Sequence, residues 1–241
     1  MEKLKLNIEW LDTLLPEGFP LHTSTLVSGP GGSGKPLIGY IFASSYLKQG
    51  GNLIMILTST TKEYVVNVMK LFGTDLEEYK EKIFYIELDV DIDLMEKVDE
   101  NWIKLNLVKP EAWDEMRKYI KGDEMVVASA LNLLFFSKTY GNAIYEKLKD
   151  IIKNDKTTTY FFTINSDAFK EKAVGLENVA DNLMFSRMEK PMKLFLRIER
   201  MKDVKFIGDE VEVPLTPEIL QSIKEEAEKG KKNLIPAISK I

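Results

Sequence analysis

The sequence predicts an α/β fold with a mainly parallel central sheet and an antiparallel extension near the C-terminus. Three observations support this prediction. A short apolar segment runs into a glycine-rich stretch that is followed by a helical pattern. Unbroken apolar runs of strand length then alternate with helical patterns, which is typical of parallel strands covered on both faces. Later, three strand-like segments follow one another closely, which favours antiparallel pairing.

The first predicted elements are a strand, a glycine-rich loop and a helix. Residues 23–28 (TSTLVS) are short, β-branched and apolar, so they predict a strand. The helix follows in LIGYIFASSYLKQGG, where apolar residues recur at helical spacing and two glycines end the pattern. The runs NLIMILTS and IFYIEL predict the second and third strands, with a helix between them from about Lys62 to Phe72.

The middle of the chain is less regular. The stretch DVDIDLMEKVDENWIKLN is acidic and predicts no clear element, whereas Pro110 begins a helix that runs to about Ile120. The first half of MVVASALNLLFF predicts another central strand. A stripe of Ile and Leu predicts a helix over residues 141–154, and TTTYFFTIN, β-branched and aromatic, predicts the strand after it.

The C-terminal part predicts the antiparallel extension and a final helix. Residues 182–186, 193–200 and 205–213 have strand patterns. Thr216 as N-cap and Pro217 begin a helix rich in Glu and Lys, and the apolar tail LIPAISKI is expected to dock on its own core or on a neighbour. Without repeats or a linker in the sequence, we predict a single domain over 1–241, with the C-terminal helix and tail in 216–241.

Composition limits the kind of site. No apolar run approaches the length of a bilayer-spanning helix, and the N-terminus lacks the apolar stretch of a signal peptide, so we expect a cytoplasmic protein. There is no Cys and the only His is His22, so we expect neither thiolate catalysis nor a metal site. The net charge of −5 opposes broad attraction to nucleic acid.

The glycine-rich stretch GPGGSGKP, residues 29–36, matches a phosphate-binding loop except at its last residue. Gly29, Gly34 and Lys35 satisfy G-x-x-x-x-G-K, after which the pattern requires Ser or Thr and the sequence has Pro36. Backbone N–H groups of such a loop surround an anion, and the lysine reaches the terminal phosphates. The predicted nucleotide-binding residues are Gly29, Gly31, Gly32, Ser33, Gly34 and Lys35.

Pro36 removes two groups from this loop. It has no hydroxyl for Mg²⁺ and no N–H for phosphate, and each charge-assisted hydrogen bond lost is worth roughly 1.5 to 3 kcal/mol. Proline also disfavours helical angles in the residue before it, so we expect Lys35 to depart from the pose that ATP requires. The alternative interpretation is that Pro36 is simply a favourable first residue of a helix.

The chain resembles the ATPase core of the RecA superfamily, most closely the KaiC-like branch common among archaeal recombinase paralogues and signalling ATPases. The resemblance lies in five segments that occur in the family's order: IEWLDTLLPEGFPLHTSTLVSGPGGSGK, EYVVNVMKLFG, VVASALNLL, GLENVADNLM and LRIERMK. It implies a three-layer RecA-like P-loop fold and a nucleotide-binding site of the ATPase type.

The resemblance also implies where catalytic carboxylates belong. Family members carry two adjacent Glu after the second strand, one of which polarises the attacking water, and here Ser59 and Thr60 match those places. Another strand normally ends in an Asp that supports Mg²⁺, and Ser129 matches it. A general base is worth about 10² to 10⁴ in rate. With Pro36, these degenerate positions predict no hydrolysis, no tightly held Mg²⁺ and weak binding of ATP or ADP.

A final implication concerns neighbouring subunits. The family places a Lys and an Arg, two residues apart, where they reach the ATP of the next subunit, and Arg200 and Lys202 match those places with the identities exchanged. The alternative is ordinary exposed charge on an edge strand. If they act in trans, the chain forms a homo-oligomer, or a hetero-oligomer with a RecA/KaiC-like paralogue, as a ring or filament. No membrane partner is expected.

Three functions remain open from the sequence. The first is a non-hydrolysing regulatory or scaffolding subunit, so we lean against an enzyme. The second is a weak or atypical ATPase. The third is a recombinase-paralogue accessory factor in DNA repair, for which the basic loops around Lys138, Lys170 and Lys172 would bind single strands, although the net charge does not indicate nucleic acid.

Overall fold

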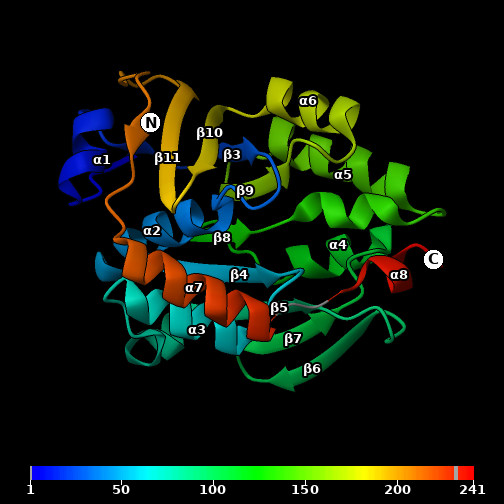
Figure 1. Cartoon of the computed structure of the whole chain (residues 1–241). Coiled ribbons are helices and arrows are strands. Elements are labelled where there is room, and N and C mark those ends of the chain that lie inside the picture. The colour runs from blue at the N-terminus through cyan, green and yellow to red at the C-terminus, as the bar shows by residue number, and fades with distance from the viewer. Residues whose placement is uncertain (1, 231–232) are drawn as a thin grey trace.

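The computed structural model describes residues 2–230 and 233–241. Within them, a ten-stranded sheet has the order β12-β11-β10-β3-β9-β8-β4-β5-β7-β6, with helices on both faces (Figure 1). All neighbouring strands from β10 to β7 are parallel, while β11 and β12 at one edge and β6 at the other are antiparallel. The predicted α/β fold with a C-terminal antiparallel extension is therefore confirmed.

The strands of this sheet are β3 (Ser24–Gly29), β4 (Asn52–Leu57), β5 (Ile83–Leu88), β6 (Met95–Asp99), β7 (Trp102–Leu105), β8 (Glu124–Ala128), β9 (Thr159–Asn165), β10 (Asn182–Glu189), β11 (Lys193–Arg200) and β12 (Val211–Glu212). A small second sheet pairs β1 (Lys3–Leu4) with β2 (Phe19–Pro20). The helices are α1 (Glu9–Leu14), α2 (Lys35–Lys48), α3 (Lys62–Leu71), α4 (Pro110–Arg117), α5 (Gly141–Asn154), α6 (Lys170–Val179), α7 (Pro217–Gly230) and α8 (Ile235–Ile238), with 3-10 turns η1 (Leu76–Lys82) and η2 (Leu131–Phe136).

Two apolar cores lie on the two faces of the sheet. One core lies under α1, α2, α3 and α7, and the other under α4, α5, α6 and α8. Successive side chains of a strand point to opposite faces, so in β4 Leu53 and Met55 enter the first core, while Ile54 and Ile56 enter the second. Burial on both faces explains why the central strands are unbroken apolar runs, and it gives the three layers of the fold.

Two expectations at the sheet edges are wrong. The acidic stretch without a predicted element contains the β6–β7 hairpin, in which every residue of β6 is exposed, so no apolar pattern marks it. The strand expected over 205–213 shortens to β12, whose two residues pair with Phe195 and Leu196. Gly208 and Asp209 lie in the irregular segment just before it, and both residue types are disfavoured in strands.

The tail docks on its own chain. Ile238 of α8 is fully buried in the second core, and Leu234 and Ile241 pack beside it. The Thr139 N–H donates to the Ile241 carbonyl at 3.1 Å. Of the two predicted alternatives, the structure therefore has the tail on its own core.

Bilayer crossing demands a helix that is both long and strongly apolar, and none of the helices in the described ranges meets both conditions.

Candidate functional site

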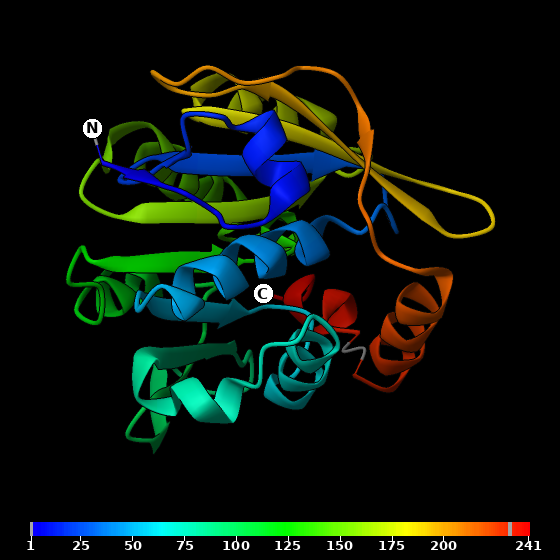
Figure 2. The ribbon, with the colours of Figure 1, turned by 90° about the vertical axis from the view of Figure 1, so that its left-hand side faces the viewer.

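The loop between β3 and α2 needs glycine for two different reasons. Gly32 and Gly34 have φ of +73° and +72°, in the left-handed region. A Cβ on Gly34 would also lie 2.8 Å from Leu194 Cδ1, and one on Gly29 would lie 2.3 Å from the Ser186 backbone oxygen. The hairpin of β10 and β11 thus packs directly on the loop, which lies at its base in Figure 2.

Helix α2 begins at Lys35, with Pro36 in its first turn. The departure of Lys35 from helical angles that Pro36 led us to expect is not found, because Lys35 is the first residue of α2 and Gly34, in a left-handed conformation, is its N-cap. The Leu37 N–H donates to the Gly34 carbonyl at 3.0 Å, a 3-10 type bond that closes the first turn of the helix. Pro36 is therefore well placed as an early helical residue, but it still offers a ligand neither an N–H nor a hydroxyl.

The side chain of Lys35 turns back onto its own loop. Its Nζ donates to the Gly29 carbonyl at 2.9 Å, the Pro30 carbonyl at 2.6 Å and Ser33 Oγ at 3.1 Å. The residue is 7% exposed, and burial lowers the pKa of Lys35 to about 8, an effect that the nearby Asp167 carboxylate opposes. All three hydrogens of the ammonium therefore have acceptors within the loop, and a phosphate must compete with them.

Ser59 and Thr60 follow β4, and Ser129 follows β8, the neighbouring parallel strand. The structure brings them to the edge of the sheet where the glycine-rich loop also lies, because carboxyl ends of parallel strands share one edge. The Thr58 hydroxyl donates to the Ser129 carbonyl and joins the two strand ends. The Thr60 hydroxyl lies beside the hydroxyl of Tyr40 on α2. Thr60 Oγ1 is buried and has no hydrogen-bond partner among the described residues. The three residues that match the family's acids, Ser59, Thr60 and Ser129, offer no carboxylate.

Sequence reasoning missed the last residue of β9, the strand between β3 and β8, and the two residues that follow it. The Asn165 amide faces Gly31, because a Cβ there would lie 3.5 Å from Asn165 Nδ2. The Ser166 N–H donates to the Gly29 carbonyl at 2.9 Å. Asp167 follows, within electrostatic range of the Lys35 ammonium. The available signal was the polar run Asn-Ser-Asp directly after an apolar strand at the carboxyl edge.

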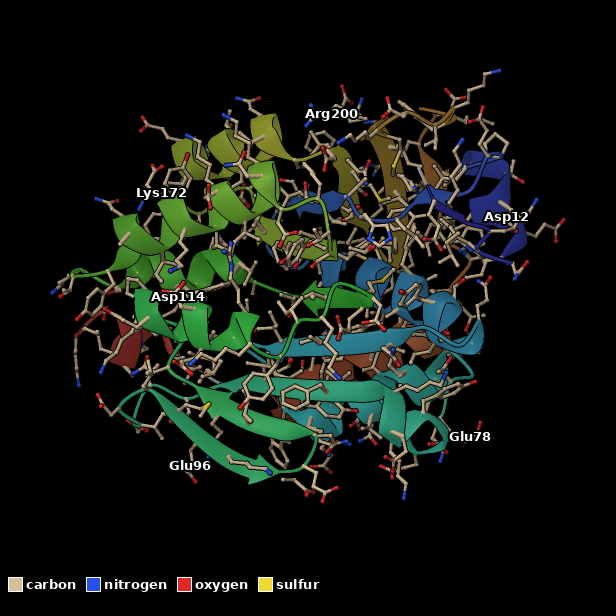
Figure 3. The ribbon with its side chains drawn as sticks, turned by 180° about the vertical axis from the view of Figure 1, so that it is seen from behind. Asp12, Glu78, Glu96, Asp114, Lys172 and Arg200 are labelled. Carbon is tan, nitrogen blue, oxygen red and sulfur yellow. The ribbon has the colours of Figure 1, made fainter. Side chains whose placement is uncertain are left out.

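Arg200 and Lys202 do not approach the loop of their own chain. Arg200 Nη2 donates to the carbonyls of Glu177 and Ala180, at the end of α6, where Figure 3 shows it. Lys202 Nζ donates to Asp181 Oδ1 at 3.1 Å, at the amino-terminal end of β3. Both cations therefore make contacts within their own chain. These contacts lie at the amino-terminal ends of β3 and β10, whereas the loop follows the carboxyl end of β3.

A pocket of about 670 Å³ opens at the amino-terminal ends of β4, β5 and β8, away from the loop. Phe84 and Tyr119 line it, stacked with ring centroids 4.9 Å apart. Lysines and carboxylates are mixed around it, so the lining favours no single class of ligand. The glycine-rich loop remains the candidate site because its residue pattern is the one that binds phosphate groups, and the positive charge of Lys35 lies there.

Comparison with known proteins agrees with this geometry. The matching family model is that of the KaiC ATPase, over residues 4–226. A solved KaiC-like protein from the hyperthermophilic archaeon Pyrococcus horikoshii OT3 is 17% identical, with a TM-score of 0.68, over 90% of this chain and 96% of that chain. No curated protein matches. The structural likeness supports the fold, and the family match includes the loop and the ends of β4, β8 and β9.

Proposed function

The chain belongs to the KaiC family of ATPases, and we propose that within this family it is a non-hydrolysing regulatory or scaffolding subunit. One observation supports this most strongly. Phosphoryl transfer uses a magnesium hydroxyl, a water-activating carboxylate and a metal-supporting carboxylate. The matching places here hold Pro36, the pair Ser59 and Thr60, and Ser129. Positioning and charge stabilisation supply nearly all catalysis of phosphoryl transfer, so their joint loss leaves a binding fold.

The loop residues fit a phosphate group better than a magnesium ion. Gly32 and Gly34 give the loop its left-handed turns, and the ammonium of Lys35 is already held there. Mg²⁺ prefers oxygen ligands in strict octahedral geometry, usually carboxylates together with phosphate oxygens. Pro36 has no such oxygen, and Ser129 contributes its carbonyl to a hydrogen bond with Thr58. ATP or ADP therefore binds weakly, through the loop and Lys35, with little help from magnesium.

The two residues that match the family's acids after β4, Ser59 and Thr60, carry hydroxyl groups in place of a carboxylate. The Thr60 hydroxyl lies against Tyr40, and burial raises the pKa of Tyr40 far above neutrality. A neutral phenol beside a neutral hydroxyl does not take a proton from water at physiological pH. This supports retention of a bound nucleotide without turnover.

The partner in this proposal is a second copy or a RecA/KaiC-like paralogue. To reach the nucleotide of a neighbouring subunit, Arg200 and Lys202 would have to break their contacts with α6 and Asp181. In this conformation, these two cations therefore contribute little to the association of subunits. Assembly then depends on complementary surfaces, and nucleotide serves as a structural ligand.

Phosphate release from ATP in the presence of Mg²⁺ tests the proposal. We expect wild type and Lys35→Ala to give the same background rate. Lys48→Ala is the matched control, because Lys48 is exposed at the far end of the same helix. Release that exceeds background in wild type and Lys48→Ala, and is abolished by Lys35→Ala, would contradict the proposal and favour the weak ATPase instead.

One observation favours a second candidate function, the binding of single-stranded nucleic acid. The rings of Phe136 and Phe169 lie 4.8 Å apart, and they bring the segment that carries Lys138 close to the start of α6 at Lys170. Basic groups beside aromatic rings are the usual surface for single strands. Lys172 is less accessible, because its ammonium lies over the Phe169 ring at 5.5 Å.

A fluorescent oligonucleotide titrated at several salt concentrations tests this candidate. Binding that weakens steeply with salt, and that the double change Lys138→Ala, Lys170→Ala reduces further, would support it. Absence of binding at low salt would exclude it.

A further inference from the structure

The segment after β9 is fastened to the glycine-rich loop. The Ser166 N–H donates to the carbonyl of Gly29, the first residue of the loop. The Asn165 side chain faces Gly31, and its Oδ1 accepts a hydrogen bond from the Asp167 N–H at 2.9 Å. These contacts fix the backbone that leads into Asp167, up to its own N–H. Asp167 is therefore held at the loop by geometry, although it lies far from it in sequence.

Asp167 brings a negative charge to a site whose other groups attract anions. Its carboxylate is exposed and acts electrostatically on the buried ammonium of Lys35. The neutral acceptors of Lys35 are the Gly29 and Pro30 carbonyls and the Ser33 hydroxyl. A phosphate bound to Lys35 would be exposed to the field of the same carboxylate. The negative charges of the phosphate and of Asp167 would then repel each other.

We propose that Asp167 is a built-in counter-charge of the glycine-rich loop, which pairs electrostatically with Lys35 and weakens the binding of phosphate groups. This deepens the proposed function, because it depends on the loop being an anion site. It also explains how Lys35 stays turned inward: carbonyl groups of the loop hold its hydrogens, and Asp167 balances its charge. Neutralising Asp167 should open the loop to phosphate.

Calorimetric titration with inorganic phosphate and with ADP, in the absence of divalent cations, tests the proposal. Working at about pH 6.5, below the pKa of Lys35, keeps the ammonium charged. We expect Asp167→Asn to bind both ligands about fivefold more tightly than wild type, which is the order of one screened like-charge contact. Glu171→Gln is the matched control, since Glu171 is exposed, lies four residues further along the chain and loses the same charge.

Each other outcome decides against the proposal. Equal or weaker binding by Asp167→Asn overturns it, and so does a complete lack of binding by both proteins, because the neutralised loop should hold phosphate. An equal gain in Glu171→Gln would mean that net charge alone is responsible. The double variant Asp167→Asn, Lys35→Ala should bind phosphate less tightly than Asp167→Asn alone. If the two bind equally, the anion lies away from Lys35 and the proposal is wrong.

Titrations repeated with Mg²⁺ separate a counter-charge from a metal ligand. A counter-charge predicts that Asp167→Asn binds ADP more tightly with or without Mg²⁺. If Mg²⁺ tightens binding to wild type and Asp167→Asn removes that gain, Asp167 holds a cation and the proposal is wrong. The proposed function has its own test, the release of phosphate from ATP. Release that depends on Lys35 would contradict the non-hydrolysing role, whatever the titrations show for Asp167.

Discussion

Asp181, directly before β10, joins distant parts of the chain through one carboxylate. Its Oδ2 accepts from the Ser24 N–H at 3.0 Å and from Lys156 Nζ at 2.5 Å, and its Oδ1 accepts from Lys202 Nζ at 3.1 Å. The side chain is only 11% exposed. We predict that Asp181→Asn lowers the free energy of unfolding by about 2 kcal/mol.

The magnitude follows from what asparagine keeps and loses. Its amide oxygen, in the place of Oδ2, still accepts from the Ser24 N–H and from Lys156, but without the negative charge. The amide NH2 takes the place of Oδ1 and cannot accept from Lys202, so the loss comes from the weakened bond to Lys156 and the broken bond to Lys202. Each charge-assisted bond is worth about 1.5 to 3 kcal/mol when buried. Because the lysine side chains are 35% and 36% exposed, solvent screening reduces the sum to about 2 kcal/mol. For a chain of this size, that loss lowers Tm by about 4 to 8 °C.

Urea unfolding followed by circular dichroism measures this loss. The control is Asp114→Asn, because that carboxylate is 64% exposed and pairs with Lys147 on the surface, where the cost is below about 0.5 kcal/mol. Similar small losses for the two variants would refute the reasoning.

The same carboxylate predicts a pH dependence. Burial opposes its ionisation, but hydrogen bonds from Lys156 and Ser24 outweigh burial, so the pKa of Asp181 lies below its ordinary value. A lowered folded-state pKa adds stability that is complete above the unfolded pKa of about 3.9 and is lost as pH falls through the folded pKa. The stability difference between wild type and Asp181→Asn should therefore shrink below about pH 4.

Three further changes test the site. Gly34→Ala should cost more stability than Gly32→Ala in thermal unfolding, because both have positive φ but only the Cβ at Gly34 meets Leu194, at 2.8 Å; equal costs would contradict this. Pro36→Thr should tighten nucleotide binding in calorimetry, because it restores an N–H and a hydroxyl. The variant should still release no phosphate from ATP, and turnover would show that the missing carboxylates are dispensable. Arg200→Ala should speed hydrogen exchange at the end of α6, whose carbonyls it caps, and leave nucleotide binding unchanged.

Local patterns in the sequence predicted most of the fold. The helix α5 and the strand β5 have the predicted bounds, because an amphipathic stripe and a bounded apolar run are signals that neighbouring residues contain. The hairpin of β6 and β7 gave no such signal, since an exposed edge strand has no buried face to make its sequence alternate. The short β12 depends on pairing with β11, which its own residues do not specify.

The candidate site was predictable only where it is contiguous. The loop from Gly29 to Lys35 is one uninterrupted motif, and the strands that lead to Thr60 and Ser129 were recognisable as apolar runs. Asp167 approaches Lys35 only through parallel pairing of β9 with β3, a contact between segments more than a hundred residues apart. The inward turn of Lys35 likewise depends on carbonyl positions that no motif specifies.

The magnesium dependence of ATP binding tests most directly whether this chain keeps an anion-binding loop without a metal site. Calorimetric titrations with ATP are run in EDTA and again in excess Mg²⁺, on wild type and on Lys35→Ala. We predict equal, weak affinities for wild type in the two buffers and weaker binding by Lys35→Ala in both. Tightening by about tenfold or more with Mg²⁺ in wild type, lost in Lys35→Ala, would contradict the claim.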